Sequence, residues 1–494
     1  MTAGNKLSLV DQAFLMMESA DTPAHVGALQ IFRLPEGNAA EYFSDLVEKI
    51  HDQPAGIPNS LMLEGGRFRP GRSRWQETEI DPDYHFRRLA LPSPGSREQL
   101  LELVARLHSR PLDRRYPLWE VYLIEIPGSD RFALYSKIHH ACTDGMATVA
   151  LLERIFSTSP DDRNPVAPWN SGREVRKKKR RQKPALTASL RLRRGGRLLR
   201  DLTGWSRDFL INYLRDRDLV AAPYDAPHTL MNGPVSPRRT MALCSLDLTD
   251  IRKVCRKEGV TVNDVVLSVC GGALRSYLES RKNLPEKSLV ASLPVSLRFD
   301  EGRGGGNQVS FLMCRLATDE KDPVKRLHRI SASVQEAKNR LQPMSRESAM
   351  VITLAADGMH LTTGPLSRIS DRTPPLTNLV ISNMTGTGET LYWNGARMEG
   401  TWPLSMLVDG QALNITAVSN GGALNIGVVA CQAAVPDAAP IARGISRSFS
   451  ELCRALDLPE AGEALVDNAT GSAFGVEVEK PRPAKKRRAR RSRG

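Results

Sequence analysis

The segment 131–140 alternates apolar and polar positions in the way that predicts a β-strand. Its even positions, from Phe132 to His140, form the more apolar row, while the odd positions end at His139 and include a tyrosine and a lysine. Small or apolar residues then recur at spacings of four, three and four from Gly145 to Phe156, which predicts a helix. The pattern therefore predicts a strand-to-helix turn with the imidazole of His140 on its inner side, a suitable place for a general base.

The rest of the first half alternates predicted helices with predicted strands. Ser96 and Gln99 form a capping box before a helix with a clear apolar stripe, and Pro111 ends that helix. The other predicted elements are an amphipathic stretch over 7–18, a strand over 25–32, a helix over 39–50 and a strand over 121–126. Such alternation is typical of an α/β layer structure.

The second half restarts near Arg239 with the same mixture of elements. One helix is expected to be capped by Thr249 and closed by Gly259, and a stronger one is expected to start at Thr261 and Asp264. Further strands are predicted over 241–246, 289–295, 309–316, 413–418 and 424–429, with a helix over 323–341 and short strands dominating from Leu379 onwards. Residues 302–306 are rich in glycine, but they precede a strand and lack the residues of a phosphate-binding loop, so we interpret them as a turn.

Length and composition indicate a globular protein of two to three domains. No apolar run approaches the roughly 18 residues of a membrane-spanning helix, and the N-terminus does not resemble a secretory signal. We therefore expect a cytoplasmic protein that can rest on a membrane without crossing it.

The seven cysteines include no CxxC pair, which argues against disulfides and a cysteine zinc site. Cys142 is interpreted as a small buried thiol rather than a nucleophile.

The positive charge is concentrated in two segments. Residues 173–200 hold thirteen Lys and Arg against one Glu, and residues 480–494 hold nine basic and no acidic residues. Removing both from the net charge of +14 leaves −7 for the rest of the chain. The tail has no aromatic residue on which bases could stack, so an anionic membrane or lipid-droplet surface is favoured over nucleic acid.

The composition of residues 158–184 indicates a linker. Residues 191–214 are predicted to form a helix that either packs on the folded part of the protein or lies on a lipid surface.

The turn itself reads His139-His140-Ala141-Cys142-Thr143-Asp144-Gly145, an HHxxxDG motif. A chance match in a chain of this length has a probability on the order of 10⁻³. Adjacent strand side chains point to opposite faces, so His139 and His140 cannot easily share a metal ion, and no metal is expected. A purely structural role for both histidines stays open. Alternatively, His140 takes a proton from an alcohol as it attacks a thioester, while Asp144 holds the turn together.

The sequence resembles the bacterial wax ester synthase/diacylglycerol acyltransferase family, one of the CoA-dependent acyltransferases with an HHxxxDG signature. The resemblance covers roughly residues 6 to 455. Besides the heptapeptide it rests on Leu7-Ser8 with Asp11, Phe14-Leu15 and Glu18, His25-Val26-Gly27, Pro111-Leu112-Asp113, Pro117-Leu118-Trp119-Glu120, Asn263-Asp264, Pro294-Val295-Ser296 with Arg298, Gly306-Asn307, Ser382-Asn383 and Leu413-Asn414-Ile415.

This resemblance implies two chloramphenicol-acetyltransferase-like α/β domains with an active-site tunnel between them. The boundaries we expect are 1–165 and 236–470 for the domains, 166–235 for a basic linker and crossover helix, and 471–494 for a disordered basic tail. The resemblance further implies His140 as the general base, with His139, Asp144 and Gly145 completing the motif. The residues tied to site architecture are Pro117, Leu118, Trp119, Asn263, Asp264, Arg298 and Asn307.

The implied reaction moves a long-chain acyl group from acyl-CoA, a co-substrate rather than a bound cofactor, to diacylglycerol or a fatty alcohol. Two other functions stay open: condensation on an acyl group held by a carrier protein, and a catalytically silent protein on a lipid surface.

One departure from the family pattern concerns the loop after Asn383. The family continues with Val-Pro-Gly-Pro, whereas residues 384–387 here are Met-Thr-Gly-Thr, which puts the shape of the loop and the acceptor preference in question.

Overall fold

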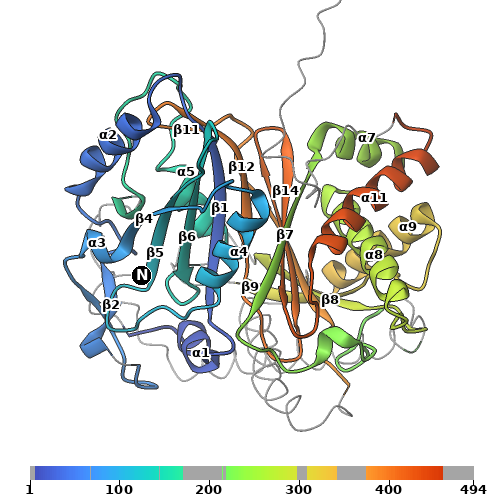
Figure 1. Ribbon diagram of the computed structural model, residues 1–494. Helices are drawn as coiled ribbons and strands as arrows, with labels where there is room; N and C mark the ends of the chain where they lie inside the picture. The colour runs from blue at the N-terminus through green and yellow to red at the C-terminus, as the bar shows by residue number, and fades with distance from the viewer. Residues whose placement is uncertain are drawn as a thin grey trace, which may run out of the picture.

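The computed structural model describes residues 6–66, 68–143, 145–170, 214, 219–296, 309–341 and 374–459 of the 494-residue chain. Two six-stranded sheets stand side by side with helices on their flanks (Figure 1). The mixed α/β class predicted from the alternation of elements is confirmed. Within the described ranges, no helix is both long and apolar enough to cross a membrane.

The first sheet has the strand order β11-β12-β1-β6-β5-β4. Its strands are β1 (His25–Arg33), β4 (Phe86–Ala90), β5 (Trp119–Glu125), β6 (Arg131–His139), β11 (Tyr392–Trp393) and β12 (Ala396–Leu404). The accompanying elements are α1 (Leu9–Met17), α2 (Ala39–His51), α3 (Pro82–His85), α4 (Arg97–His108), α5 (Gly145–Glu153) and a small hairpin of β2 (Leu61–Leu63) and β3 (Trp75–Glu77). Strand β6 thus lies inside the sheet, between β1 and β5.

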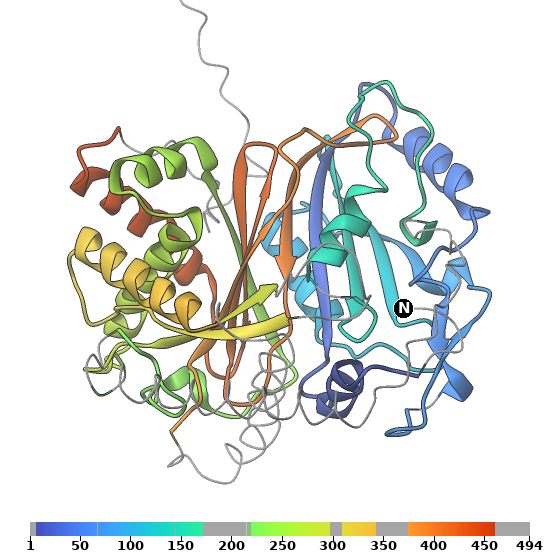
Figure 2. The same ribbon diagram turned by 180° about the vertical axis from the view of Figure 1, so that it is seen from behind.

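The second sheet has the order β7-β14-β13-β10-β8-β9. Its strands are β7 (Arg239–Asp247), β8 (Val290–Ser296), β9 (Val309–Arg315), β10 (Leu379–Thr385), β13 (Leu413–Asn420) and β14 (Ala423–Cys431). Its helices are α7 (Leu248–Glu258), α8 (Val262–Ser280), α9 (Pro323–Leu341) and α11 (Ala439–Ala455). These helices cover the face of the sheet that points away from the first sheet (Figures 1 and 2).

Strands β11 and β12 come from the second half of the chain but belong to the first sheet. Strand β12 runs antiparallel to β1, with Gln30 paired to Thr401 and Gly27 to Leu404. Without it, the buried strand β1 would present an unpaired edge. The predicted boundary of 236–470 for the second domain did not include this exchange. The chain therefore ties the two halves together by backbone hydrogen bonds.

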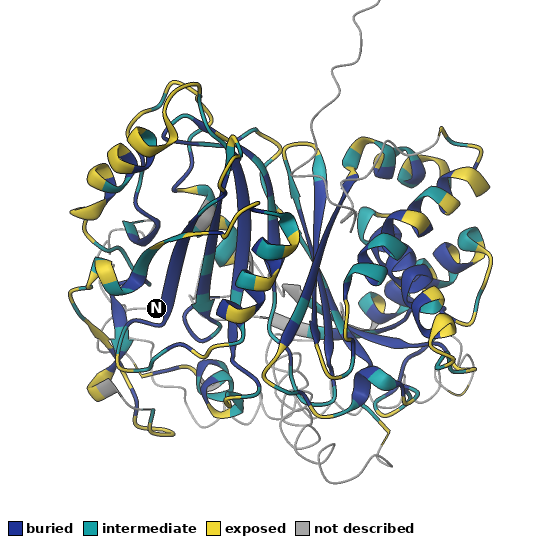
Figure 3. Ribbon diagram, in the orientation of Figure 1, coloured by how far each residue is buried: buried dark blue, intermediate teal, exposed yellow. Residues whose placement is uncertain are grey.

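The two sheets approach each other closely where β12 passes β14. A Cβ atom on Gly427 would lie 2.0 Å from the carbonyl oxygen of Pro403, so only glycine fits there. Around this contact one hydrophobic core spans both sheets, with Leu29, Tyr135, Leu243 and Trp402 all buried. The central strands of both sheets are correspondingly buried along most of their length (Figure 3). The contact fixes the position of one sheet relative to the other.

Local sequence signals predicted several helix ends correctly, but α5 ends at Glu153, short of the predicted Phe156. Both reciprocal hydrogen bonds of the Ser96–Gln99 capping box form, and α9 spans the predicted 323–341. The cap of α7 is Asp247, not Thr249, because the Asp247 carboxylate accepts the N–H groups of Thr249 and Asp250. Helix α11 was not predicted, since Pro440, Gly444 and several serines weaken its helical pattern.

Several predictions concern residues outside the described ranges. They are the greater part of the basic linker and crossover helix, the glycine-rich turn at 302–306 and the basic tail. The start of the linker is described and is anchored to the first domain. There Trp169 is fully buried, and its indole N–H donates to the carbonyl oxygen of Gln53 (2.8 Å).

Candidate functional site

A cavity of about 640 Å³ lies between the two halves of the molecule. Side chains from α1, β1 and α5 line it on one side, and side chains from β8, β10 and β13 line it on the other. Most of this lining is apolar. Among the described residues, its ionisable side chains are His140, Glu153, Lys338 and Asp409. The predicted junction between two domains therefore holds a real cavity, while its continuation as an open tunnel stays a prediction.

His140 reaches this cavity because β6 ends one residue earlier. Its backbone N–H donates to the carbonyl oxygen of Ala24 (2.8 Å), which continues the pairing of β6 with β1. Its ring stacks on Phe14 of α1, with centroids 4.0 Å apart and planes 17° from parallel. The side chain is half-buried and lines the cavity. An imidazole in this position can exchange a proton with a bound molecule while its ring orientation is held by Phe14.

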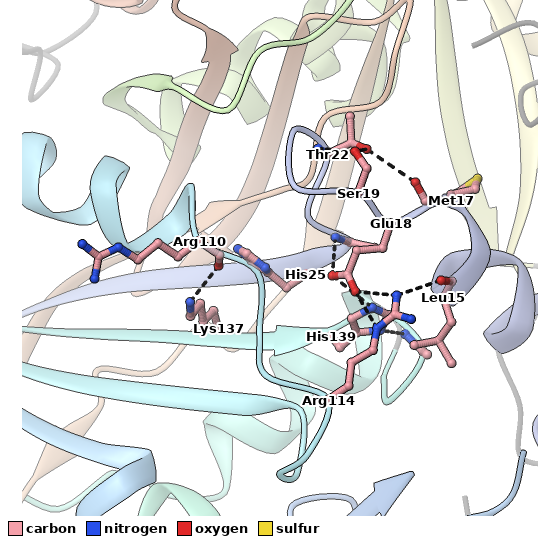
Figure 4. A network of polar contacts seen from close by, with 12 residues as sticks. Leu15, Met17, Glu18, Ser19, Thr22, His25, Arg110, Arg114, Lys137 and His139 are labelled. Carbon is pink, nitrogen blue, oxygen red and sulfur yellow. Dashed lines mark hydrogen bonds and ion pairs between the residues drawn. The ribbon is translucent and has the colours of Figure 1, made fainter. Parts of the chain in front are cut away.

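His139 points the other way and is fully buried. Its Nδ1 accepts the N–H of Ala141 (3.0 Å), so a proton on the ring resides on Nε2, which lies 3.5 Å from Oε1 of Glu18. Its backbone N–H donates to the carbonyl oxygen of Leu118 (2.9 Å). These contacts, drawn in part in Figure 4, fix the end of β6. His139 thus holds the turn that carries His140 and does not face the cavity.

Glu18 and Arg114 extend this network and were not among the predicted site residues. Nε and Nη2 of Arg114 lie 3.1 and 2.8 Å from Oε2 of Glu18, and Nη2 also donates to the carbonyl oxygen of Leu15 (Figure 4). Burial by itself would raise the pKa of the Glu18 carboxyl, but hydrogen bonds from His139, Arg114 and the N–H of Ala24 lower that pKa to about 2. The ionised carboxylate therefore joins α1 to the motif.

A second buried network lies farther along the same face of β6. The ammonium of Lys137 is 3.0 Å from Oε2 of Glu120 and donates to the carbonyl oxygens of Leu107 and Arg110 at the end of α4. Burial lowers the pKa of Lys137 even though Glu120 opposes this change. The pair fastens α4 to the sheet behind the cavity.

Two further buried histidines complete this region. Nε2 of His25 contacts the carbonyl oxygen of His108 (2.9 Å), and Nδ1 of His108 contacts the hydroxyl of Tyr135 (2.8 Å). Burial lowers the pKa of His25 well below its usual value and that of His108 to about 3. Both rings are therefore neutral near pH 7, and neither lines the cavity.

The Pro117-Leu118-Trp119 motif lies behind the cavity rather than in it. Leu118 provides the carbonyl oxygen that binds His139, as described above. The indole of Trp119 donates to the carbonyl oxygen of Asn59 (2.8 Å) and stacks on His85, with centroids 4.2 Å apart. All three residues of the motif are buried. The motif therefore supports the turn and does not line the cavity.

The two residues of the Asn263-Asp264 motif have different positions. Asn263 lines the cavity near the start of α8. Asp264 forms a capping box with Thr261, accepting its N–H (2.9 Å), and also accepts the hydroxyl of Ser331 (3.3 Å). Asp264 therefore orients the helix that presents Asn263. Of the remaining predicted residues, Gly145 begins α5, while Asp144, Arg298 and Asn307 lie outside the described ranges.

The loop after Asn383, which departs from the family pattern, borders the cavity. Met384 and Gly386 line it, and the N–H of Thr387 donates to Oε1 of Glu153 on α5 (2.7 Å). A Cβ on Gly386 would lie 2.5 Å from the carbonyl oxygen of Ser419, which explains why glycine is kept although the prolines are lost. This loop connects the second half to α5 directly beside the motif.

Within the described part of the chain, neither a thiol nucleophile in the motif nor a metal centre is evident. Cys142 is buried, and burial raises the pKa of its thiol, which disfavours the thiolate. Within the same ranges, no three His, Cys, Asp or Glu side chains are grouped so that they could hold a metal ion. Among the described residues, the cavity wall holds one imidazole, that of His140, beside the carboxyl groups of Glu153 and Asp409 and the amine of Lys338.

Comparisons with known proteins agree with this geometry. The chain matches the family model described as the wax ester synthase/diacylglycerol acyltransferase catalytic domain over residues 7–266, and that of the C-terminal domain of the same proteins over 305–453. A Mycobacterium tuberculosis protein named as a diacylglycerol O-acyltransferase is 38% identical, over 92% of this chain and all of its own length. The O-acyltransferase WSD of Acinetobacter baylyi is 35% identical, over 86% of this chain and 92% of its own.

Solved structures give the same result. The wax ester synthase/diacylglycerol acyltransferase from Marinobacter aquaeolei VT8 superposes with a TM-score of 0.71 at 32% identity, covering 93% of this chain and all of that one. The starter condensation domain of rhizomide synthetase, at 14% identity and a TM-score of 0.53, covers 92% of this chain and 97% of its own, and shows likeness of fold alone. The predicted arrangement of two acyltransferase-like domains is confirmed.

Proposed function

Because the chain belongs to the wax ester synthase/diacylglycerol acyltransferase family, we propose that it is an acyl-CoA-dependent O-acyltransferase with His140 as its general base. The acceptor is diacylglycerol, a long-chain alcohol, or both. The observation that carries the proposal is the half-buried imidazole of His140 in the wall of an apolar cavity, stacked on Phe14. The two family models, which together cover most of the chain, support the reaction class.

The reaction needs one proton to move twice. His140 takes the proton from the acceptor hydroxyl while the oxygen attacks the thioester carbonyl, forming a tetrahedral oxyanion. When the C–S bond breaks, the ester is released and the imidazolium returns the proton to the departing CoA sulfur. The other ionisable side chains of the cavity suit this role less well. Glu153 is bound to the N–H of Thr387, Asp409 accepts the N–H of Val235 (2.9 Å), and Lys338 is of a residue type that donates hydrogen bonds rather than accepts them.

The buried network around His139 supports His140 without touching the reactants. Glu18, Arg114 and Leu118 hold His139 and the end of β6, so the base enters the reaction with its backbone already fixed. Such preorganisation removes an ordering cost from the reaction step. We assign Asp144 and Gly145 the role of completing the turn, and Asn263, Arg298 and Asn307 that of shaping the site from the second half.

The basic segments at 173–200 and 480–494 are assigned to attraction toward an anionic membrane or lipid-droplet surface. Each Lys or Arg near such a surface contributes about 1 kcal/mol. Their excess of positive charge over an otherwise acidic chain supports this assignment. A lipid surface is also where diacylglycerol and long-chain alcohols partition, so the enzyme would meet its acceptor there.

The proposal is tested by a two-acceptor assay on the full chain. Palmitoyl-CoA is supplied with either dioleoylglycerol or hexadecanol, and ester formation and CoA release are both measured. We expect equal amounts of ester and CoA with at least one acceptor. Turnover of a carrier-protein thioester without turnover of palmitoyl-CoA would instead establish the condensation-type alternative.

A further inference from the structure

Gln30 is a buried amide in the wall of the cavity that no part of the proposed reaction uses. It lies in the middle of β1, is fully buried and lines the cavity. Neither Nε2 nor Oε1 of its side chain has a hydrogen-bond partner within the described part of the chain. Because an unpaired buried amide destabilises a protein, such a group calls for a partner supplied from outside the chain.

Three other polar residues of the cavity differ from Gln30 because they are already paired within the protein. The side-chain oxygen of Asn414 accepts the hydroxyl of Thr416 (2.7 Å), and its amide donates to the carbonyl oxygen of Met406 (3.4 Å). Ser405 and Thr416 also bond to each other (2.9 Å). Gln30 therefore offers both a donor and an acceptor to a bound molecule.

The strand register places Gln30 far from the reacting end of the cavity. The backbone N–H of His140 donates to the carbonyl oxygen of Ala24, so these two residues lie side by side. Gln30 is six residues beyond Ala24 along the same strand direction. At about 3.3 Å per residue this is roughly 20 Å, comparable to the length of an extended hexadecyl chain. Val26, Ala28 and Gln30 all line the cavity, so it follows β1 over this distance.

Thr401 stands directly opposite Gln30 on β12 and also lines the cavity. Residues directly opposite in an antiparallel pair have Cβ atoms about 5 Å apart, so their polar groups can bind the same ligand atom. Beyond this pair the lining becomes apolar again, with Phe156, Leu391 and Met398. Gln30 and Thr401 thus form a short polar segment of the cavity wall between two apolar segments.

We propose that Gln30, assisted by Thr401, determines chain specificity by hydrogen-bonding a hydroxyl or carbonyl oxygen at the far end of a long substrate chain. This inference rests on the proposed function, since it takes the reacting end of that chain to lie at His140. An unsubstituted chain that reaches the same depth leaves the amide unpaired. A site built to bond an oxygen discriminates strongly against an analogue that lacks it.

The oxygen can be carried by either substrate, and two pairs of ligands distinguish these sources. For the acceptor, the dissociation constant of 1-hexadecanol is compared with that of its α,ω-diol. For the donor, palmitoyl-CoA is compared with ω-hydroxypalmitoyl-CoA. Each pair is measured by calorimetry on the wild-type chain and on the Gln30→Leu variant. In at least one pair, we expect the preference for the oxygenated ligand to fall about tenfold in the variant.

Three controls keep the result interpretable. Gln335→Leu, at an exposed position on α9, should retain the wild-type preference. Gln30→Leu should not lower the melting temperature, because it removes an unpaired amide at nearly constant volume. Thr401→Val should reduce the preference in the same ligand pair as Gln30→Leu.

Binding requires no turnover, so this test is separate from the assay of the proposed function. A chain that transfers no acyl group but loses its preference on Gln30→Leu would support the inference. Equal preferences in the wild-type and variant chains, in both ligand pairs, would overturn it.

Discussion

The two faces of the β1–β6 strand pair carry similar kinds of polar residue but have different roles. The face toward the cavity carries His140 and Gln30 in largely apolar surroundings. The opposite face carries a network of buried charges and imidazoles that includes Glu120, Lys137 and His139. On the rear, Lys137 is paired with Glu120 and bonded to backbone, whereas on the cavity face His140 and Gln30 lie in the wall of the cavity. Burial alone therefore does not mark a reactive residue; its position at the cavity does.

The same contrast explains why adjacent histidines in one motif differ in role. His139 is immobilised by a backbone N–H at one nitrogen and a carboxylate at the other. His140 is held by ring stacking and by its own backbone N–H. The rear face thus determines the position of His140, the proposed base, and the cavity face determines its surroundings. Variants on the rear should change stability first, and variants on the cavity face should change catalysis or specificity.

The largest effect on the rear face is expected for Lys137→Met. This change leaves the Glu120 carboxylate buried without its cation, which costs about 3–5 kcal/mol. Urea unfolding should show the loss as a lower midpoint at unchanged slope. The double variant Lys137→Met/Glu120→Gln should recover much of the stability, because the unpaired charge is gone. A double variant as unstable as the single variant would mean that the unpaired charge of Glu120 does not cause the loss of stability.

Glu18→Gln should remove a pH-dependent contribution to stability. The pKa of the Glu18 carboxyl is lowered from 4.5 to about 2, so its ionisation stabilises the folded state above pH 4.5, and this stabilisation is lost as pH falls toward 2. At neutral pH it amounts to about 3 kcal/mol. The difference in unfolding free energy between wild type and variant should therefore shrink between pH 5 and pH 2.

The matched control for this titration is Glu102→Gln, which removes an exposed carboxylate paired with Arg106. That variant should track wild type across the same pH range to within a few tenths of a kcal/mol. If Glu102→Gln changed the pH profile as much as Glu18→Gln, the buried network would not be its cause.

The smallest effect is expected for Trp119→Phe. It removes the indole hydrogen bond to Asn59 and should cost about 1–2 kcal/mol of stability. Because Trp119 does not line the cavity, kcat should change by less than about tenfold, measured at a temperature where both proteins are folded. A large loss of kcat in a fully folded variant would place this motif among the residues that act on the substrate.

Local features of this fold could be predicted from the sequence because their causes are local. The Ser96–Gln99 capping box and the alternation that separates His140 from His139 involve residues close together in the chain. The cap of α7 was predicted wrongly because Asp247 and Thr249 are both suitable capping residues, and only the backbone geometry selects one.

Long-range features could not be predicted in this way. Arg114 reaches Glu18 across 96 residues, and neither residue has a local pattern that indicates the other. The pairing of β12 with β1 is likewise invisible to periodicity, which reports the type of an element but not its neighbour. The unpaired amide of Gln30 could be recognised only once both strands and the cavity were in view.

Comparison of His140→Ala with His328→Ala gives the sharpest test of His140 as the proton acceptor. His328 is an exposed histidine on α9, paired with Glu258 and distant in the chain from the motif. With palmitoyl-CoA and the preferred acceptor, His140→Ala should lower kcat by about 10²–10⁴-fold while its melting temperature stays near that of wild type, and His328→Ala should retain wild-type kcat. A folded His140→Ala protein with wild-type kcat would contradict the assignment.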